Sequence, residues 1–284
     1  MYQLLALDLD GTSLKSDFTI SPVLVDTVRV LSRSIPVLIV TGRHHTAAGP
    51  YYQALGLTTP AICCNGTYVY DYQNRAVLQH NAIEKSQAVA FLQLAQARNL
   101  NVVVYLKDAM LYSSHRPVMH VARLAEWAEG FSGEVKPIIR QVDDFSPEVE
   151  GAECIWKFVV EGDDVDEFAA LPFIQQHFTG EKSWSNRIDF ASIGNTKGAA
   201  LAQLIKHKGI SPEQVVAVGD HHNDISMLEM VGMGVAMANA DENLKRHANM
   251  ITRTTNDNDH TLAELLQTLF PEHLKSTHPL GDQR

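Results

Sequence analysis

The chain opens with a short apolar run that ends at two aspartates, and this stretch constrains the fold more than any other. The run Leu4 to Leu7 is followed by Asp8 and Asp10, with a glycine and a threonine after them. A short apolar run bounded by turn residues is typical of a buried β-strand. The ligand crevice of an open α/β sheet lies beyond the carboxyl ends of its strands, so we expect both aspartates there. Two such carboxylates repel each other unless a cation or a shared proton compensates, which favours a metal site.

Apolar runs and helical patterns alternate in both terminal parts of the chain. The predicted elements are strands over residues 35–40, 61–64, 214–218 and 235–237, and helices over residues 22–31, 44–55, 197–208, 224–231 and 259–269. Strands that alternate with helices are typical of βαβ units and a parallel sheet. We therefore predict an α/β fold with a Rossmann-like, doubly wound parallel-sheet core.

The middle of the chain has a different order of elements. It reads as helix, hairpin, helix, strand, helix, strand, with weak local signals over residues 134–153 and one helix predicted over 165–178. We interpret this part as a separate α+β module inserted into the core. The predicted domains are a discontinuous core over residues 1–82 and 188–270, a cap domain over 83–187 and a loose tail over 271–284.

Charge and composition narrow the classes of partner. The formal net charge of -10 argues against nucleic acid or an anionic membrane surface as the main partner. A small anionic substrate remains compatible, because one metal ion and a few cations invert the field locally. The sequence holds three cysteines, no window of about 20 apolar residues and no basic leader, so we expect a cytoplasmic protein. The sequence leaves the oligomeric state open.

Four short segments stand where a predicted core strand ends or a core helix begins. They are residues 8–12, Thr41-Gly42-Arg43, Lys197 and residues 219–224. In this order they resemble the four signature motifs of the haloacid dehalogenase superfamily, and the insert resembles the large cap of its Cof-type phosphatases. Relatives usually carry a leucine where this chain has Ser13, at the start of the flap region. The resemblance implies a Mg²⁺-dependent phosphatase that passes through an aspartyl-phosphate.

The chemistry of phosphoryl transfer assigns roles to four of these residues. The reaction needs a nucleophile in line with the leaving oxygen and charge that matches the developing oxyanions. Asp8 is the expected nucleophile, and Asp10 is the expected acid that protonates the departing alcohol and then activates water. Thr41 offers a hydroxyl and a backbone N–H to a phosphate oxygen, and Lys197 offers a compact positive charge.

Carboxylates supply the expected metal ligands. Asp220 and Asp224 offer hard oxygen atoms that suit Mg²⁺. By the resemblance, Asp8, the backbone carbonyl of Asp10 and Asp220 hold the metal, while Asp224 either ligates it or orients Lys197. A lysine at a helix start lies at the positive end of the dipole, which is unfavourable without an anion and favours a functional Lys197.

Further contacts to the substrate are expected from residues near these motifs. The candidates are Thr41, Gly42, Arg43, Asn65, Asn195 and Asn223. Asn65 and the glycine after it also form a strong hairpin-turn dipeptide, and Arg43 is also interpretable as a structural ion-pair partner. His44 and His45 are expected to lie exposed on the first turn of a helix.

The substrate is expected to be a small phosphorylated metabolite. A finer resemblance, to bacterial pyridoxal phosphate phosphatases of the Cof type, implies pyridoxal 5′-phosphate. Sugar-phosphate or flavin mononucleotide phosphatases, and phosphotransferases or mutases with the same chemistry, are alternatives, as is a non-catalytic sensor of phosphate ligands. The candidate contacts from the cap are Tyr105, Lys107, Asp108, Tyr112, Trp156 and Lys157.

Overall fold

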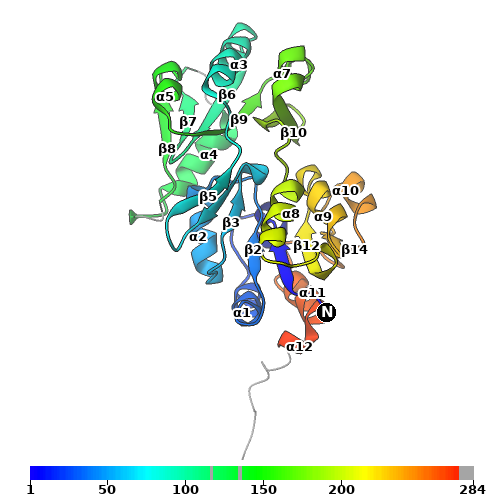
Figure 1. Cartoon of the computed structure of the whole chain (residues 1–284). Coiled ribbons are helices and arrows are strands. Elements are labelled where there is room, and N and C mark those ends of the chain that lie inside the picture. Colours follow the sequence, from blue (N-terminus) through cyan, green and yellow to red (C-terminus); the bar gives the residue numbers. More distant parts are fainter. Residues whose placement is uncertain (116–117, 134–135, 275–284) are drawn as a thin grey trace, which may run out of the picture. The chain divides into compact units, whose positions relative to one another are not determined.

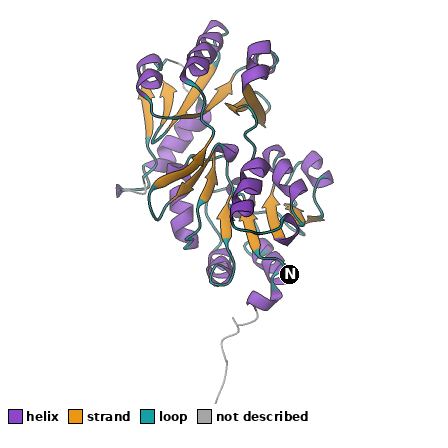
Figure 2. Cartoon of the chain, in the orientation of Figure 1, coloured by secondary structure: helices purple, strands orange, loops and turns teal. Residues whose placement is uncertain are grey.

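The structure of the protein is a computed structural model that describes residues 1–115, 118–133 and 136–274. The chain forms two compact units, shown with their helices and strands in Figures 1 and 2. The first unit comprises Met1–Val40, Tyr51–Thr59 and the chain from Leu201 onward, and the second comprises Thr41–Pro50 and Pro60–Ala200.

A five-stranded, wholly parallel sheet forms the centre of the first unit. In sheet order its strands are β14 (Met250–Ile251), β13 (Met233–Ala236), β12 (Val215–Gly219), β1 (Leu4–Leu7) and β2 (Val37–Ile39). Strands β1, β2 and β12 are buried along their whole length, as expected for apolar runs inside a doubly wound sheet. The predicted α/β class with a parallel-sheet core is confirmed.

The order of these strands reverses between β1 and β12, which lie side by side with Leu7 opposite Val218. The chain runs from β1 to β2 on one side and from β12 through β13 to β14 on the other. Crevices at such a switch point, beyond the carboxyl ends of the strands, are where open α/β sheets bind ligands. Asp8 and Asp220 are the first residues after β1 and β12, so the topology places both at this point.

Helices complete the first unit. They are α1 (Pro22–Leu31), α9 (Ile225–Met230), α10 (Glu242–Arg246), α11 (Thr261–Leu269) and α12 (Pro271–Leu274), together with parts of α2 (His45–Leu55) and α8 (Lys197–His207). The Ser21 side chain caps α1 by accepting the N–H of Leu24. The predicted loose tail begins with helix α12, in which Leu274 is buried, and residues 275–284 lie outside the described residues.

The second unit contains a six-stranded sheet of its own. In sheet order its strands are β10 (Phe178–Trp184), β11 (Arg187–Ser192), β9 (Ile155–Glu161), β6 (Asn101–Leu106), β7 (Met110–Ser113) and β8 (Ile139–Val142). All neighbours are antiparallel except β7 and β8. The helices of this part are α3 (Lys85–Ala97), α4 (Met119–Ala128), α5 (Ser146–Gly151), α6 (Val165–Ala169) and α7 (Pro172–His177).

Stacked aromatic rings form the core of this α+β part. Phe91 of α3 lies on Phe158 of β9 with ring centroids 4.3 Å apart, and Phe168 and Phe190 pack edge-on against Phe91. The single helix predicted over 165–178 is divided into α6 and α7 before Pro172. Leu171 is extended (φ -61°, ψ 137°), because a residue before proline avoids the helical region.

A strand does form within the predicted range 61–64, but its expected place in the parallel sheet is wrong. Strand β3 (Ala61–Cys63) pairs antiparallel with β4 (Tyr68–Asp71), which pairs with β5 (Ala76–His80). The turn between β3 and β4 contains Asn65 at φ +56° and Gly66 at φ +90°. This left-handed backbone reverses the chain within a few residues, so β3 pairs with its immediate successor.

No helix in the described part of the chain is long and apolar enough to cross a membrane. The predicted domain limits differ in detail from the two compact units, and they stay a prediction.

Candidate active site

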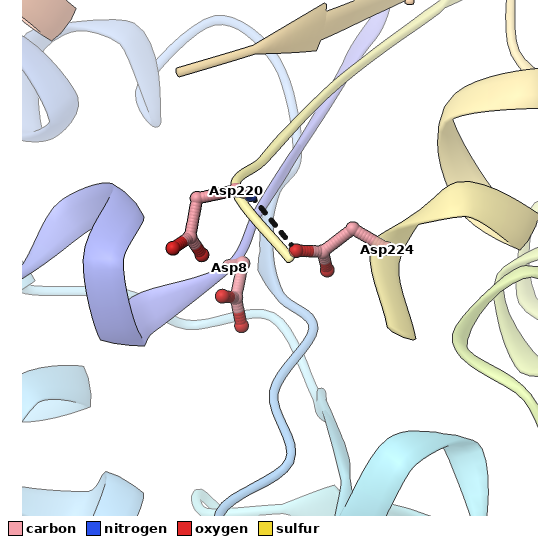
Figure 3. Close-up of side chains that lie close together, drawn as sticks. All are labelled: Asp8, Asp220 and Asp224. Atoms are coloured by element: carbon pink, nitrogen blue, oxygen red, sulfur yellow. Dashed lines mark hydrogen bonds between the residues drawn. The ribbon is translucent and has the colours of Figure 1, made fainter. Parts of the chain in front are cut away.

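Three carboxylates converge at the switch point of the parallel sheet. Asp8, Asp220 and Asp224 each offer a carboxylate oxygen, and these oxygens lie within 4.8 Å of one another (Figure 3). Asp8 and Asp224 are buried, so their mutual repulsion is only weakly screened by water. A cluster of hard carboxylate oxygens at this spacing suits a divalent cation. The residues present therefore fit a metal ion of this kind.

The loop after β1 is shaped to approach Asp220. Residues Leu9–Ser13 form one wide turn, non-helical at Asp10 and Gly11 and closed by a hydrogen bond from the N–H of Leu14 to the carbonyl of Leu9. Within it Gly11 has φ +69°, and a Cβ atom there would lie 2.0 Å from Oδ2 of Asp220. Only glycine permits this approach. The Thr12 hydroxyl, from the same turn, donates to Oδ1 of Asp220 at 3.3 Å.

Asp224 holds the loop that carries Asp220. Its Oδ2 accepts the backbone N–H of Asp220 at 2.9 Å, drawn dashed in Figure 3, and that of His221 at 3.1 Å. A Cβ atom at Gly219 would lie 2.4 Å from Cγ of Asp224, so the loop needs a glycine there. Asn223 is half-buried in the same loop. Asp224 thus has a role that the sequence did not suggest, while its predicted role, as a metal ligand or as a residue that orients Lys197, stays a prediction.

Ser13 contacts the backbone of the predicted nucleophile. Its buried hydroxyl donates to the carbonyl oxygen of Asp8 at 2.6 Å. Sequence reasoning missed this contact, although a serine in place of an apolar residue was its signal. Asp10, by contrast, is exposed, and the carboxylate cluster consists of the other three aspartates. Its predicted backbone contact to a metal stays a prediction.

The second predicted motif lies in the second unit, where neighbouring backbone holds it. Thr41 is fully buried, and its N–H donates to the carbonyl of Ile62 at 2.9 Å. Its own carbonyl accepts the N–H of Asn65 at 3.1 Å, and its hydroxyl accepts the N–H of Arg43 at 3.1 Å. The Arg43 guanidinium lies over the ring of Trp127, 5.3 Å from the centroid. Asn65 is buried in the turn that this loop contacts.

Lys197 is the first residue of α8, and it is fully buried. A buried ammonium at the positive end of a helix is costly unless an anion is nearby, which agrees with a phosphate-binding role. The Asn195 side chain donates to Thr67 and to the carbonyl of Asn81, and its Oδ1 accepts from the Asn81 side chain. Asn195 therefore anchors the backbone that leads into Lys197. Its predicted contact with substrate stays a prediction.

The expectation that His44 and His45 are exposed is wrong, because both rings enter an aromatic cluster. His44 is fully buried and its Nε2 donates to the carbonyl of Leu106 at 2.9 Å. His45 stacks on Tyr70, and its Nδ1 is 2.9 Å from the hydroxyl of Tyr68. Burial lowers the pKa of His44 to about 4 and that of His45 to about 2. Both rings are therefore neutral near pH 7.

Comparison with known proteins agrees with this fold. The pattern of the haloacid dehalogenase-like hydrolases matches residues 5–266. The chain is 39% identical over 253 residues to the pyridoxal phosphate phosphatase YbhA of Escherichia coli, covering 88% of this chain and 92% of that protein. It is 28% identical over 274 residues to the 5-amino-6-(5-phospho-D-ribitylamino)uracil phosphatase YitU of Bacillus subtilis, covering 94% and 97%. The solved structure of a haloacid dehalogenase-like hydrolase from B. subtilis superposes with a TM-score of 0.81 at 26% identity, covering 94% of this chain and all of that one.

The chain belongs to the haloacid dehalogenase-like hydrolase family. Within that family it is a phosphatase, as the names of its relatives and the carboxylate cluster together indicate.

Proposed function

We propose that the protein is a cytoplasmic, Mg²⁺-dependent phosphatase that hydrolyses small phosphomonoesters, with pyridoxal 5′-phosphate as its best candidate substrate. The observation that carries the proposal is the convergence of Asp8, Asp220 and Asp224 at the switch point of the parallel sheet.

The reaction uses two aspartates of the opening loop in different roles. A carboxylate oxygen of Asp8 bonds to phosphorus while the ester P–O bond breaks, and Asp10 gives its proton to the departing alcohol. Water then attacks the phosphorus of the aspartyl-phosphate and gives a proton to Asp10. The bond between phosphorus and the Asp8 oxygen breaks, so phosphate is released and the Asp8 carboxylate is restored. The exposure of Asp10 leaves its carboxyl group able to exchange protons with solvent.

Asp8 and Asp220 would hold Mg²⁺ together with the carbonyl of Asp10, and Asp224 would keep Asp220 in place through the loop it caps. The metal supplies positive charge that offsets the phosphate oxygens and the clustered carboxylates. Thr41 is assigned to donate a hydrogen bond to a phosphate oxygen, and Lys197 is assigned to offset the negative charge of the phosphate with its ammonium group.

Pyridoxal 5′-phosphate is favoured by the 39% identity to the E. coli enzyme of that name over most of both chains. The YitU relative is named for a flavin precursor, so flavin-related phosphates are the second candidates, with sugar phosphates beside them.

Of the predicted cap contacts, Trp156 is buried and stacked on Tyr68, and Lys107 pairs with Glu153 at the surface. These positions suit structural roles better than selection of substrate.

A phosphotransferase or mutase would use the same aspartyl-phosphate and pass it to an acceptor alcohol in place of water. A sensor would bind phosphate ligands without turnover. Transfer to an added alcohol, or the absence of turnover on a broad panel, would favour these alternatives respectively.

A panel of phosphorylated metabolites assayed with Mg²⁺ and with a chelator tests the proposal. We expect pyridoxal 5′-phosphate among the substrates with the highest kcat/KM. Chelation should lower phosphate release at least about tenfold, because the phosphate oxygens then lose the positive charge of the metal, and added Mg²⁺ should restore it. Pyridoxal phosphate among the poorest substrates would refute the substrate assignment, and turnover that is indifferent to chelation would refute the metal assignment.

A further inference from the structure

A buried ion pair lies on one face of the six-stranded sheet, opposite the aromatic core. In β9 the side chains of Phe158 and Val160 point into that core, so Lys157 points to the other face. Strand register places Tyr105 of β6 directly opposite Lys157. Asp189 of β11 is opposite residue 159, two positions along β9, which puts it diagonally within reach of Lys157.

The Lys157 ammonium has three partners, all in the second unit. It donates to Oδ2 of Asp189 at 2.5 Å and to the carbonyl of Gly42 at 2.8 Å, and it lies 4.6 Å from the centroid of the Tyr105 ring. The lysine side chain is 3% exposed. Burial by itself lowers the pKa of Lys157, but the Asp189 carboxylate together with Tyr105 and Cys64 raises this pKa overall, so the ammonium stays charged.

The Gly42 carbonyl belongs to the same peptide group as the N–H of Arg43. That N–H donates to the Thr41 hydroxyl at 3.1 Å. One peptide therefore connects the ammonium to the hydroxyl, and a cation at the carbonyl end strengthens donation at the N–H end. The hydroxyl oxygen of Thr41 accepts the N–H of Arg43. The hydroxyl hydrogen of Thr41 therefore points away from that bond and is donated to another group.

A second contact attaches the same loop to the sheet. The Nε2 of His44 donates to the carbonyl of Leu106, the last residue of β6, which is the strand paired with β9. The loop is therefore fixed at the residues before and after Arg43. Of these two contacts, only the one from Lys157 acts on the peptide that contacts Thr41.

We propose that Lys157, held by Asp189, is a positioning residue for phosphate binding, which acts through the Gly42–Arg43 peptide to orient the Thr41 hydroxyl. The inference rests on the proposed function, because that function assigns the Thr41 hydroxyl to a phosphate oxygen. The pair thus connects the sheet of the second unit to a residue of the phosphate site.

A double-mutant cycle tests this coupling. Lys157→Met alone leaves Asp189 buried without its cation and invites misfolding, so the charge is removed with the double variant Lys157→Met/Asp189→Asn. The second arm is Thr41→Val, and the third combines all three substitutions. The measurements are the dissociation constant of inorganic phosphate by calorimetry in the presence of Mg²⁺, and kcat/KM for p-nitrophenyl phosphate.

We expect the double variant and Thr41→Val each to weaken phosphate binding and to lower kcat/KM by about tenfold, the usual effect of a charge-assisted hydrogen bond. The triple variant should be no worse than Thr41→Val, because the lysine acts only through that hydroxyl. Lys157→Arg, which keeps the charge beside Asp189, should recover most of the lost affinity.

Effects that add in the triple variant would overturn the proposal, since an additive loss is what a merely structural role produces. Unchanged phosphate affinity in either arm would overturn it as well. The matched control is Lys182→Met/Asp166→Asn, which removes an exposed ion pair of the same unit and should change neither quantity. Failure of the proposed function can be told apart from failure of this inference. An unaltered protein without turnover would refute the proposed function, whereas the dissociation constants of phosphate for the variants test the inference without any need for turnover.

Discussion

The substitution Asp8→Asn is expected to abolish Mg²⁺-dependent release of phosphate from p-nitrophenyl phosphate while the protein stays folded. An amide has nearly the shape of a carboxylate but lacks the nucleophilic oxygen anion, so the aspartyl-phosphate cannot form. Loss of a nucleophile costs about ten-thousandfold or more in kcat. Measurement of kcat at saturating substrate, with residual activity compared to a mock preparation, decides the result.

Stability of the same variant supplies the check on folding. Asp8 is buried within 4.8 Å of two further carboxylates, so removing its charge relieves repulsion in the metal-free protein. The free energy of unfolding without metal should therefore be unchanged or higher. Asp26→Asn, which removes an exposed carboxylate from α1 in the same unit, is the matched control and should keep full activity. Substantial turnover by a folded Asp8→Asn protein would contradict the nucleophile assignment.

The convergence of Asp8 and Asp220 was predictable because topology alone brings them together. Each follows a buried apolar strand, and neighbouring parallel strands end at the same edge of a sheet. No knowledge of side-chain packing was needed. The same reasoning did not give the role of Asp224, because its two bonds to backbone N–H groups depend on the local path of the loop.

Most of the errors come from features that local sequence does not determine, although the turn at Asn65 did carry a local signal in its Asn-Gly dipeptide. Strand β3 has the apolar pattern of a core strand, and only the left-handed turn at Asn65 sends it into another sheet. Polar residues at the start of a helix are usually exposed, yet His44 and His45 meet an aromatic cluster assembled from distant segments. The pairing of Lys157 with Asp189 could likewise not be predicted, since it depends on the register of two antiparallel strands.

Gly11 provides a test of the metal site that does not alter any ligand. It lies in the left-handed region at φ +69°, so Gly11→Ala carries a backbone cost of about 1 kcal/mol. The new methyl group would also lie 2.0 Å from Oδ2 of Asp220, which must then move by about 1 Å or more. A displacement of that size at a catalytic group costs about a hundredfold in rate. We therefore expect kcat/KM to fall about a hundredfold and the Mg²⁺ concentration for half-maximal activity to rise.

The matched control separates the effect of the steric clash with Asp220 from the effect of backbone strain at a left-handed residue. Gly209 has φ +67°, and nothing lies within 4 Å of a Cβ atom built there. Gly209→Ala should therefore show the same loss of about 1 kcal/mol in unfolding free energy, with unchanged kcat/KM and unchanged response to Mg²⁺. If both alanine variants lost activity to the same extent, backbone strain would explain the effect. If both kept it, the approach of the opening loop to Asp220 would have no part in metal binding.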